Sequence, residues 1–387
     1  MSKIMARLPK GVSVRRIFIT VLIAAGLISG GTPAAVAAAP APGTIVSATV
    51  ITLPADLAAK GTAVRIEYRT TDIRGAAITA TGLILTPKTT LKRNRVVVWA
   101  HGTTGITDAC VPSTNYQVFW PEARKAVLEL LRRGYTVAAP DYPGLGTPQA
   151  HPYLVGESEA RSIIDIAKSS RILYPGLGKE YALDGHSQGG QGVLFAGEIA
   201  PSYDGDLVLK GLAAIAPASN LDVIAPDIPG TEGQGYLVMA VAGLSAVDSS
   251  VKPEQVFTSY AKSKAAELPA NACLNEILAK FRPLTAEQLV PNGQVPPTIV
   301  SKLGQYGNPA QRPPTSPILV VHGTADVAVP YVITEQFLIP QLQAWNKPYP
   351  ITLVTLEGRD HEGAVYDSTV TVADQIDRWL GFPVPQH

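Results

Sequence analysis

The stretch that most constrains how this chain can fold is residues 185–189, which read GHSQG and match the G-x-S-x-G nucleophile elbow. An apolar run, Tyr181 to Leu183, precedes it, and a helix-compatible run, Gly192 to Ile199, follows it. A strand, a sharp turn and a helix in this order hold a serine hydroxyl clear of its own backbone, where a base can remove its proton. The flanking glycines lack the Cβ that would crowd such a turn. We therefore predict that Ser187 is a nucleophile.

A serine nucleophile needs a base and an acid, and candidates for both follow in the chain. Residues 317–330 read PILVVHGTADVAVP, a buried-type strand followed by a turn in which Asp326 is the first carboxylate. Residues 351–365 read ITLVTLEGRDHEGAV, a strand followed by a loop that carries His361. The order serine, aspartate, histidine is that of the α/β-hydrolases. We predict a catalytic triad in which His361 is the base and Asp326 orients it.

Each member of this triad has an alternative. The elbow motif can arise by chance in a glycine-rich chain, and Asp326 could be an ordinary turn former. His361 is preferred as the base because, apart from the terminal His387, it is the only histidine that follows the last strand. Asp222 and Asp227, just after the sixth core strand, are fallback acids, and Asp360 and Glu362 flank His361 and could be mistaken for the acid.

With this motif order the chain resembles an α/β-hydrolase serine esterase. Its long insertion and its cysteine placement resemble the secretory lipase family, the group that includes lipase A of Candida antarctica. The resemblance covers nearly all of the chain after residue 44. It implies an α/β fold with a mostly parallel central sheet and a helical cap inserted between strands 6 and 7.

The same resemblance implies an oxyanion hole built from main-chain donors. Residues 102–105 read GTTG and follow a strand, so Thr103 or Thr104 would supply the loop donor. Gln188, the residue after the nucleophile, would supply the second N–H. The alternative for GTTG is a plain turn bounded by glycines.

Alternating strands and helices predict one doubly wound core interrupted by the cap. The core occupies residues 40–219 and 317–387, and the cap occupies residues 220–316. The apolar run YLVMAVAGL, residues 236–244, either packs the cap onto the core or lines an acyl pocket. The last part of the insertion, residues 291–317, is expected to be a proline-rich connection.

The first 39 residues have the layout of a secretory signal peptide: a basic start, an apolar stretch from Ile17 to Ile28, and small residues at 35–39. Pro40 disfavours cleavage directly after Ala39, so a cut after Ala37 or Ala38 is expected; an uncleaved signal anchor is the alternative. The whole chain carries a net charge of +1 and this segment carries five positive groups and no acid, so the remainder carries −4. This balance gives no electrostatic reason to expect nucleic-acid binding.

Export also bears on the two cysteines, because thiols in an oxidising compartment tend to pair. Cys110 lies just after the strand that ends at His101, and Cys273 lies in the insertion. We predict a disulfide between them that ties the cap to the loop beside the active site. Closing so long a loop would contribute roughly 4 to 5 kcal/mol in the chain-entropy model.

These features together predict a secreted carboxylic ester hydrolase that forms an acyl-enzyme intermediate. The expected substrate is a triacylglycerol or another acyl ester, with contact to a lipid interface through the cap as a further expectation. The sequence has neither Cys/His metal-ligand spacing nor a phosphate-binding loop, so we expect no metal and no cofactor. No obligate protein partner is expected. The alternatives are a peptidase or amidase on the same fold, and a binding protein with a vestigial elbow.

Overall fold

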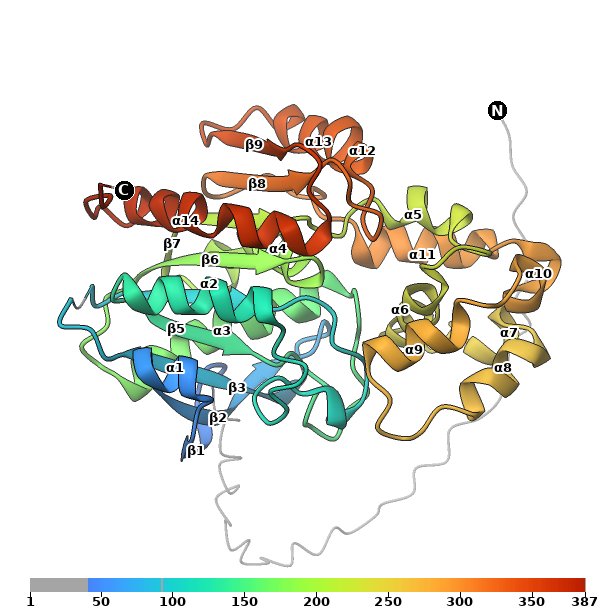
Figure 1. The fold of residues 1–387 in the computed structure, drawn as a ribbon, viewed down its shortest axis with the longest axis horizontal. Helices are drawn as coiled ribbons and strands as arrows, with labels where there is room; N and C mark the ends of the chain where they lie inside the picture. The colour runs from blue at the N-terminus through green and yellow to red at the C-terminus, as the bar shows by residue number, and fades with distance from the viewer. Residues whose placement is uncertain (1–40, 92, 387) are drawn as a thin grey trace, which may run out of the picture. The chain divides into compact units, whose positions relative to one another are not determined.

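A single nine-stranded sheet organises the chain in the computed structural model, which describes residues 41–91 and 93–386 (Figure 1). The predicted signal peptide, residues 1–39, lies outside the described residues. The strand order is β1-β2-β3-β5-β4-β6-β7-β8-β9. The strands are β1 (Ile45–Ile51), β2 (Gly61–Thr71), β3 (Ala77–Pro87), β4 (Val96–Ala100), β5 (Thr136–Pro140), β6 (Glu180–His186), β7 (Val208–Ile215), β8 (Ile318–Gly323) and β9 (Ile351–Leu356).

The sheet is antiparallel at one edge and parallel elsewhere. β1, β2 and β3 form an antiparallel ribbon, and β3 also pairs antiparallel with β5. The five pairings from β5 across to β9 are all parallel. Every residue of β4 is buried, as expected for a parallel strand covered on both faces. The predicted mostly parallel sheet is confirmed.

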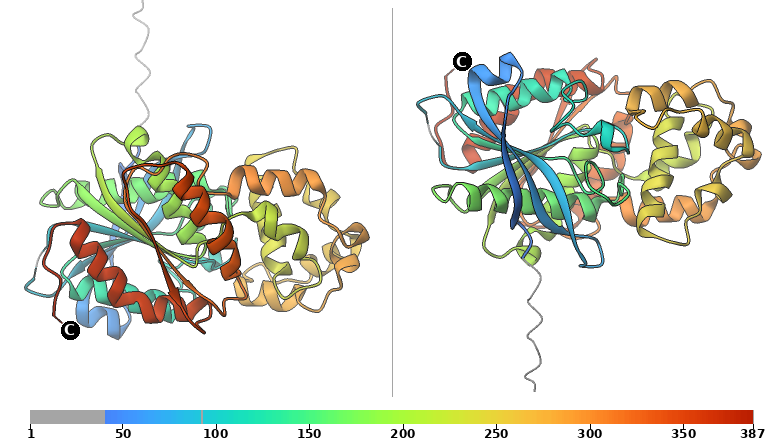
Figure 2. Two further views of the ribbon diagram at one scale, coloured as in Figure 1. Left: turned by 90° about the horizontal axis from the view of Figure 1, so that it is seen from above. Right: turned by 90° about the horizontal axis from the view of Figure 1, so that it is seen from below.

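Helices cover both faces of this sheet and bury two apolar layers (Figure 2). One layer packs under α3 (Gly156–Leu173), α4 (Gln188–Tyr203) and α13 (Ile339–Ala344). The other packs under α1 (Ala55–Lys60), α2 (Pro121–Arg132) and α14 (His361–Trp379). Because the strands from β5 to β9 are parallel, their carboxyl ends lie along one edge, where active sites of such folds are found.

The long insertion folds as a group of short helices with its own apolar core (Figure 1). It falls between β7 and β8, the seventh and eighth strands in chain order. The sequence analysis expected it between strands 6 and 7; in this sheet three antiparallel strands precede the first parallel one. The helices are α5 (Leu221–Ile224), α6 (Gln234–Val247), α7 (Pro253–Val256), α8 (Ser259–Ala266), α9 (Leu274–Phe281), α10 (Ala286–Leu289) and α11 (Pro297–Gly307).

Two helices differ from the sequence prediction. The proline-rich connection expected over residues 291–317 contains α11, whose first residue is Pro297. Proline is tolerated there because the first helical N–H has no intrahelical partner. The loop expected to carry His361 is shorter than predicted, since α14 begins at His361 itself. Asp360 is its N-cap, and its carboxylate accepts a 2.8 Å hydrogen bond from the N–H of Gly363.

Candidate active site

Ser187 lies between the end of β6 and the start of α4. Its backbone has φ 56° and ψ −116°, a conformation that residues with a side chain rarely adopt. A Cβ on Gly185 would lie 2.3 Å from the carbonyl oxygen of Gly189, and one on Gly189 would lie 2.0 Å from that of Ala100. The glycines of the motif therefore allow the strained turn that places Ser187 at the carboxyl end of its strand.

Asp326 lies in the turn after β8 and is buried. Its Oδ1 accepts from the backbone N–H groups of Ala328 and Val329, both at 2.9 Å, and its Oδ2 accepts from Nδ1 of His361 at 2.6 Å. Burial opposes ionisation of the carboxyl, but hydrogen bonds from His322 and His361 outweigh it and hold the pKa of Asp326 well below its usual range. Asp326 is therefore an ionised carboxylate that fixes the orientation of the His361 ring.

His361 combines this hydrogen bond with access to Ser187, because both residues line one small cavity. Its Nδ1–H donates to Asp326, so Nε2 of the neutral ring carries the free lone pair. Burial would lower the pKa of His361, but the hydrogen bond and charge of Asp326, together with the nearby carboxyls of Glu362 and Glu122, raise it above the ordinary value. The ring is thus a stronger base than a free imidazole.

Two further histidines surround this pair, and the sequence analysis assigned neither of them a role. Nε2 of His322 donates to Oδ2 of Asp326 at 3.1 Å and to the carbonyl of Val329 at 2.9 Å. His186 donates to the carbonyl oxygen of His361 at 3.1 Å, and the two rings lie 4.5 Å apart. Burial lowers the pKa of His186 well below its ordinary value, so this ring stays neutral. Only tertiary contacts identify either residue, since each is simply a histidine near a strand end in the sequence.

The predicted oxyanion donors fall in different surroundings. Thr103 lines the small cavity with Ser187, and its hydroxyl lies 2.8 Å from that of Tyr153. Thr104 is fully buried, and its carbonyl accepts from the N–H of Leu274 at 2.9 Å. Thr104 lines neither of the two cavities that reach Ser187. Of the two loop threonines, Thr103 is the one that the fold brings beside the nucleophile.

Gln188, the other predicted donor, is the first residue of α4 and is held by a buried polar cluster. Its side-chain amide lies 2.8 Å from Oε1 of Glu159 and 3.2 Å from Nε2 of His151. His151 donates from Nδ1 to the carbonyl of Pro143, so its Nε2 is an acceptor, and burial lowers its pKa to about 4. Burial raises the pKa of Glu159 to about 8. Both amide hydrogens are thus engaged away from the nucleophile, and only the backbone N–H of Gln188 remains for an oxyanion.

Two of the four other carboxylates near these strand ends have other hydrogen-bond partners, and the other two line cavities. Oδ1 of Asp222 accepts from Asn308 at 2.7 Å, and Asp360 caps α14 as described above. Asp227 lines a large cavity, and Glu362 lines the small one from an exposed position. The carboxylate hydrogen-bonded to His361 is that of Asp326.

A large apolar cavity, about 650 Å³, opens on one side of Ser187. Most of its wall comes from the insertion, including Tyr236, Leu237 and Ala240 of α6. The sequence left two roles open for the run YLVMAVAGL, packing and lining a pocket, and the structure gives it both. Part of it lines this cavity, and part of it packs in the apolar core of the insertion.

The small cavity, about 120 Å³, lies on the His361 side of Ser187. Glu122, at the second position of α2, contributes a carboxyl that is 6% exposed. Burial, with a contribution from the charge of Glu362, raises the pKa of Glu122 to about 7. Besides Glu122, Ser187 and His361, the small cavity is lined by Gly102, Thr103, Trp120, His186, Tyr236, Leu274, Asn275 and Glu362.

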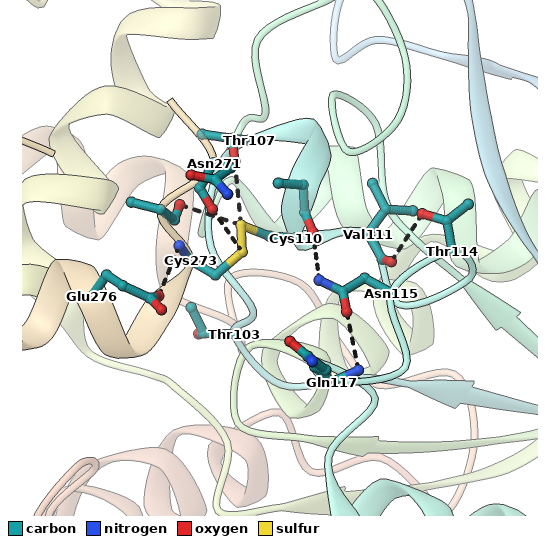
Figure 3. The surroundings of a disulfide bond; sticks show 12 residues. Thr103, Thr107, Cys110, Val111, Thr114, Asn115, Gln117, Asn271, Cys273 and Glu276 are labelled. Carbon is teal, nitrogen blue, oxygen red and sulfur yellow. Dashed lines mark hydrogen bonds between the residues drawn. A yellow bond between two sulfur atoms is a disulfide. The ribbon is translucent and has the colours of Figure 1, made fainter. Parts of the chain in front are cut away.

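The predicted disulfide between Cys110 and Cys273 is present, and their Cα atoms are 5.5 Å apart (Figure 3). Cys273 directly precedes α9, and the N–H of Leu274 donates to Thr104 in the loop after β4. The bond therefore joins the insertion to the loop that carries Thr103, next to the small cavity.

Within residues 41–91 and 93–386, no group of three or more His, Cys, Asp or Glu side chains has the arrangement needed to hold a metal ion. Over the same residues, no helix has the length and hydropathy required to cross a bilayer.

Comparison with known proteins gives consistent matches. The model of the secretory lipase family matches residues 122–345, more than half of the chain. Secreted triacylglycerol lipase LIP7 of Malassezia globosa is 24% identical over 293 residues, which cover 70% of this chain and 61% of that protein. Secreted triacylglycerol lipase LIP4 of the same organism is 26% identical over 283 residues, which cover 68% of this chain and 61% of that protein. The chain thus spans about three fifths of the length of these relatives.

Solved structures share the fold. Candida antarctica lipase A in its closed state superposes with a TM-score of 0.74 at 18% identity, covering 90% of this chain and 84% of that one. The rice cell wall degrading esterase LipA from Xanthomonas oryzae superposes with a TM-score of 0.70 at 22% identity, covering 87% and 99%. The fold is therefore that of the α/β-hydrolases, and the match to the family model shows that this chain belongs to the secretory lipase family.

Proposed function

We propose that this chain is a secreted carboxylic ester hydrolase that acts through Ser187, His361 and Asp326. The observation that carries the proposal is the buried hydrogen bond from His361 to Asp326 beside a cavity that His361 shares with Ser187. An imidazole oriented by a carboxylate next to a strained serine is the arrangement that activates a hydroxyl for acyl transfer.

The reaction proceeds in two steps. Nε2 of His361 takes the proton of Ser187 as its oxygen attacks the ester carbonyl, and then gives that proton to the departing alcohol. In the second step His361 takes a proton from water as the water attacks the acyl-enzyme, and the acid is released from Ser187. Backbone N–H groups of Thr103 and Gln188 stabilise the oxyanion of each tetrahedral intermediate, and such donors typically contribute about 3 kcal/mol each.

The large apolar cavity supports an acyl chain as the acid portion of the substrate. Its volume of about 650 Å³ is within the usual range of small-molecule sites, and its wall is mainly aliphatic. The relatives named triacylglycerol lipases support a glyceride as the natural substrate. Three valines at this cavity are exposed, and they support contact with a lipid interface: Val223, Val327 and Val332, which are 37%, 90% and 42% exposed.

Labelling with an alkylphosphonate ester and a substrate panel test the proposal. We expect the wild-type chain to be modified at Ser187 and to hydrolyse p-nitrophenyl esters, with rates measured from acetate to palmitate. Ser187→Ala should be neither labelled nor active. An aminoacyl p-nitroanilide distinguishes esterase from amidase activity. A folded wild-type protein that neither reacts with the phosphonate nor cleaves any ester would exclude this function.

A further inference from the structure

The two cavities beside Ser187 can be assigned to the two halves of an ester, given the proposed function. The two proposed oxyanion donors are divided between the cavities, since Gln188 lines the large one and Thr103 the small one, but His361 lines only the small one. The departing alcohol takes its proton from His361, so its oxygen must lie on the His361 side. The large cavity therefore receives the acyl chain, and the small cavity receives the alcohol portion.

The small cavity differs from the large one in polarity rather than in the sign of its charge, because Asp227 and Glu232 line the large cavity too but most of the wall there is aliphatic. The small cavity contains the carboxyl groups of Glu122 and Glu362, and none of the described residues that line it is a lysine or arginine. Glu122 is 6% exposed; its carboxyl accepts from its own backbone N–H, and no side chain among the described residues hydrogen-bonds to it. A buried acceptor with unused capacity that faces a cavity favours a ligand able to donate hydrogen bonds to it.

We propose that Glu122 makes this enzyme selective for esters whose alcohol portion carries hydrogen-bond donors and no negative charge, as the free hydroxyls of a partly deacylated glyceride do. The carboxyl of Glu122 accepts from a hydroxyl of the alcohol, and Glu362 adds negative potential at the exposed side of the cavity. An apolar alcohol leaves the remaining acceptor capacity of Glu122 unused, and an anionic one is repelled by both carboxyls when they are ionised.

The size of the small cavity agrees with this assignment. Its volume of about 120 Å³ is less than a fifth of the 650 Å³ of the large cavity. The small cavity therefore suits a short, branched polar fragment, and the large one suits the long chain. Trp120 closes one side, where its indole N–H donates to the carbonyl of Thr103 at 3.3 Å.

Three butyrate esters that differ only in the alcohol test the inference: 2,3-dihydroxypropyl, n-pentyl and 2-carboxyethyl butyrate. Each alcohol contributes the same number of non-hydrogen atoms beyond the ester oxygen, and the shared acyl chain keeps the large cavity equally filled. For the wild type we expect kcat/KM to be highest for the dihydroxypropyl ester and lowest for the carboxyethyl ester. In Glu122→Leu the preference for dihydroxypropyl over pentyl should fall about tenfold, the usual consequence of losing one hydrogen bond to a carboxyl.

Glu122→Gln keeps the side-chain shape and guards against a folding defect in Glu122→Leu. At pH 8, above the pKa of about 7 of Glu122, it should reduce the discrimination against the carboxyethyl ester, because it removes the negative charge of this carboxylate from the cavity. Glu287→Gln removes the same charge at an exposed position of α10 that lines neither cavity, and it should leave both ratios as in the wild type.

The outcomes separate this inference from the proposed function. If both Glu122 variants hydrolyse the three esters with wild-type ratios, the selectivity assigned to Glu122 is wrong although the hydrolase activity stands. If the wild-type protein hydrolyses none of the three esters nor p-nitrophenyl butyrate, the proposed function fails, and the inference with it.

Discussion

The large and the small cavity meet at Ser187 but differ in size, polarity and origin. The large one is about 650 Å³ and mainly aliphatic, although Asp227 and Glu232 also line it, whereas the small one is about 120 Å³ and more polar. Among the described residues, only Ser187 and Tyr236 line both cavities. Strand ends and the turns after them hold Ser187, Asp326 and His361, whereas the insertion supplies most of the large cavity, so the proposed reacting groups and the walls around them come from different parts of the fold.

The largest effect on kcat is expected from Ser187 and His361, the proposed nucleophile and base. Ser187→Ala and His361→Ala should each lower kcat on the order of 10⁶-fold, because each removes the nucleophile or its base from a unit that acts together. The nucleophile and the base act on every ester alike, so the fold-loss in kcat should be the same for every ester in a panel. Single-turnover kinetics with p-nitrophenyl butyrate, with circular dichroism to verify folding, measure this. Activity within tenfold of the wild type in either variant would contradict the assignment of the triad.

Asp326→Asn should have the next largest effect, on the order of 10⁴-fold in kcat, because an amide favours the wrong tautomer of His361. Asp222→Asn is the matched control, since Asp222 bonds to Asn308 and lines neither cavity. We expect it to stay within severalfold of the wild type. A greater loss in Asp222→Asn than in Asp326→Asn would make Asp222 the acid.

The pair His361 and Asp326 sets the acid side of the pH profile of kcat/KM. His361 must be neutral to act as a base, and its pKa is raised above the ordinary value near 6.5. We therefore expect kcat/KM to decrease as pH falls through this raised pKa. In Asp326→Asn the residual activity should persist to lower pH, because burial then acts on His361 without the opposing carboxylate. Profiles of kcat/KM against pH for both proteins check the sign of this shift.

A change confined to the large cavity should produce a smaller effect that depends on the acyl chain. Ala240 is buried and lines the cavity from α6, so Ala240→Phe fills part of its volume. We expect kcat/KM for p-nitrophenyl palmitate to fall by about 10- to 100-fold, with a much smaller change for the acetate. Ala246→Phe, at an exposed position of the same helix, is the control. Equal losses for acetate and palmitate would argue against this cavity as the acyl site.

The smallest effect on turnover is expected from the disulfide. Replacing both Cys110 and Cys273 by serine should lower the free energy of unfolding by roughly 5 kcal/mol in the chain-entropy model, given a sequence separation of 163. Hydrolysis of an alkyl ester by the folded variant should change only severalfold, whereas discrimination among alcohols should weaken, since Leu274 and Asn275 of the small cavity adjoin Cys273. Thermal unfolding and the butyrate series measure the two effects. An unchanged melting temperature would show that the bond does not restrain the unfolded chain.

The positions of the proposed triad were predictable because each residue follows a strand in a local pattern. GHSQG requires a glycine-flanked turn, and Asp326 and His361 each come just after an apolar run. α11 was missed because proline at a helix start resembles proline in a connection. The start of α14 was missed because Asp360 acts as an N-cap, which a flanking acidic residue does not reveal by itself.

The local sequence was enough to predict the α/β fold, the order of the candidate catalytic residues and the pairing of the two cysteines, because these follow from periodicity, short motifs and the presence of only two cysteines. Only the folded chain shows that His322 hydrogen-bonds to Asp326, that Glu159 and His151 hold Gln188, and that Glu122 lines the small cavity. Burial and hydrogen bonding between residues far apart in the chain depend on how helices pack over the sheet, and no local pattern records that packing.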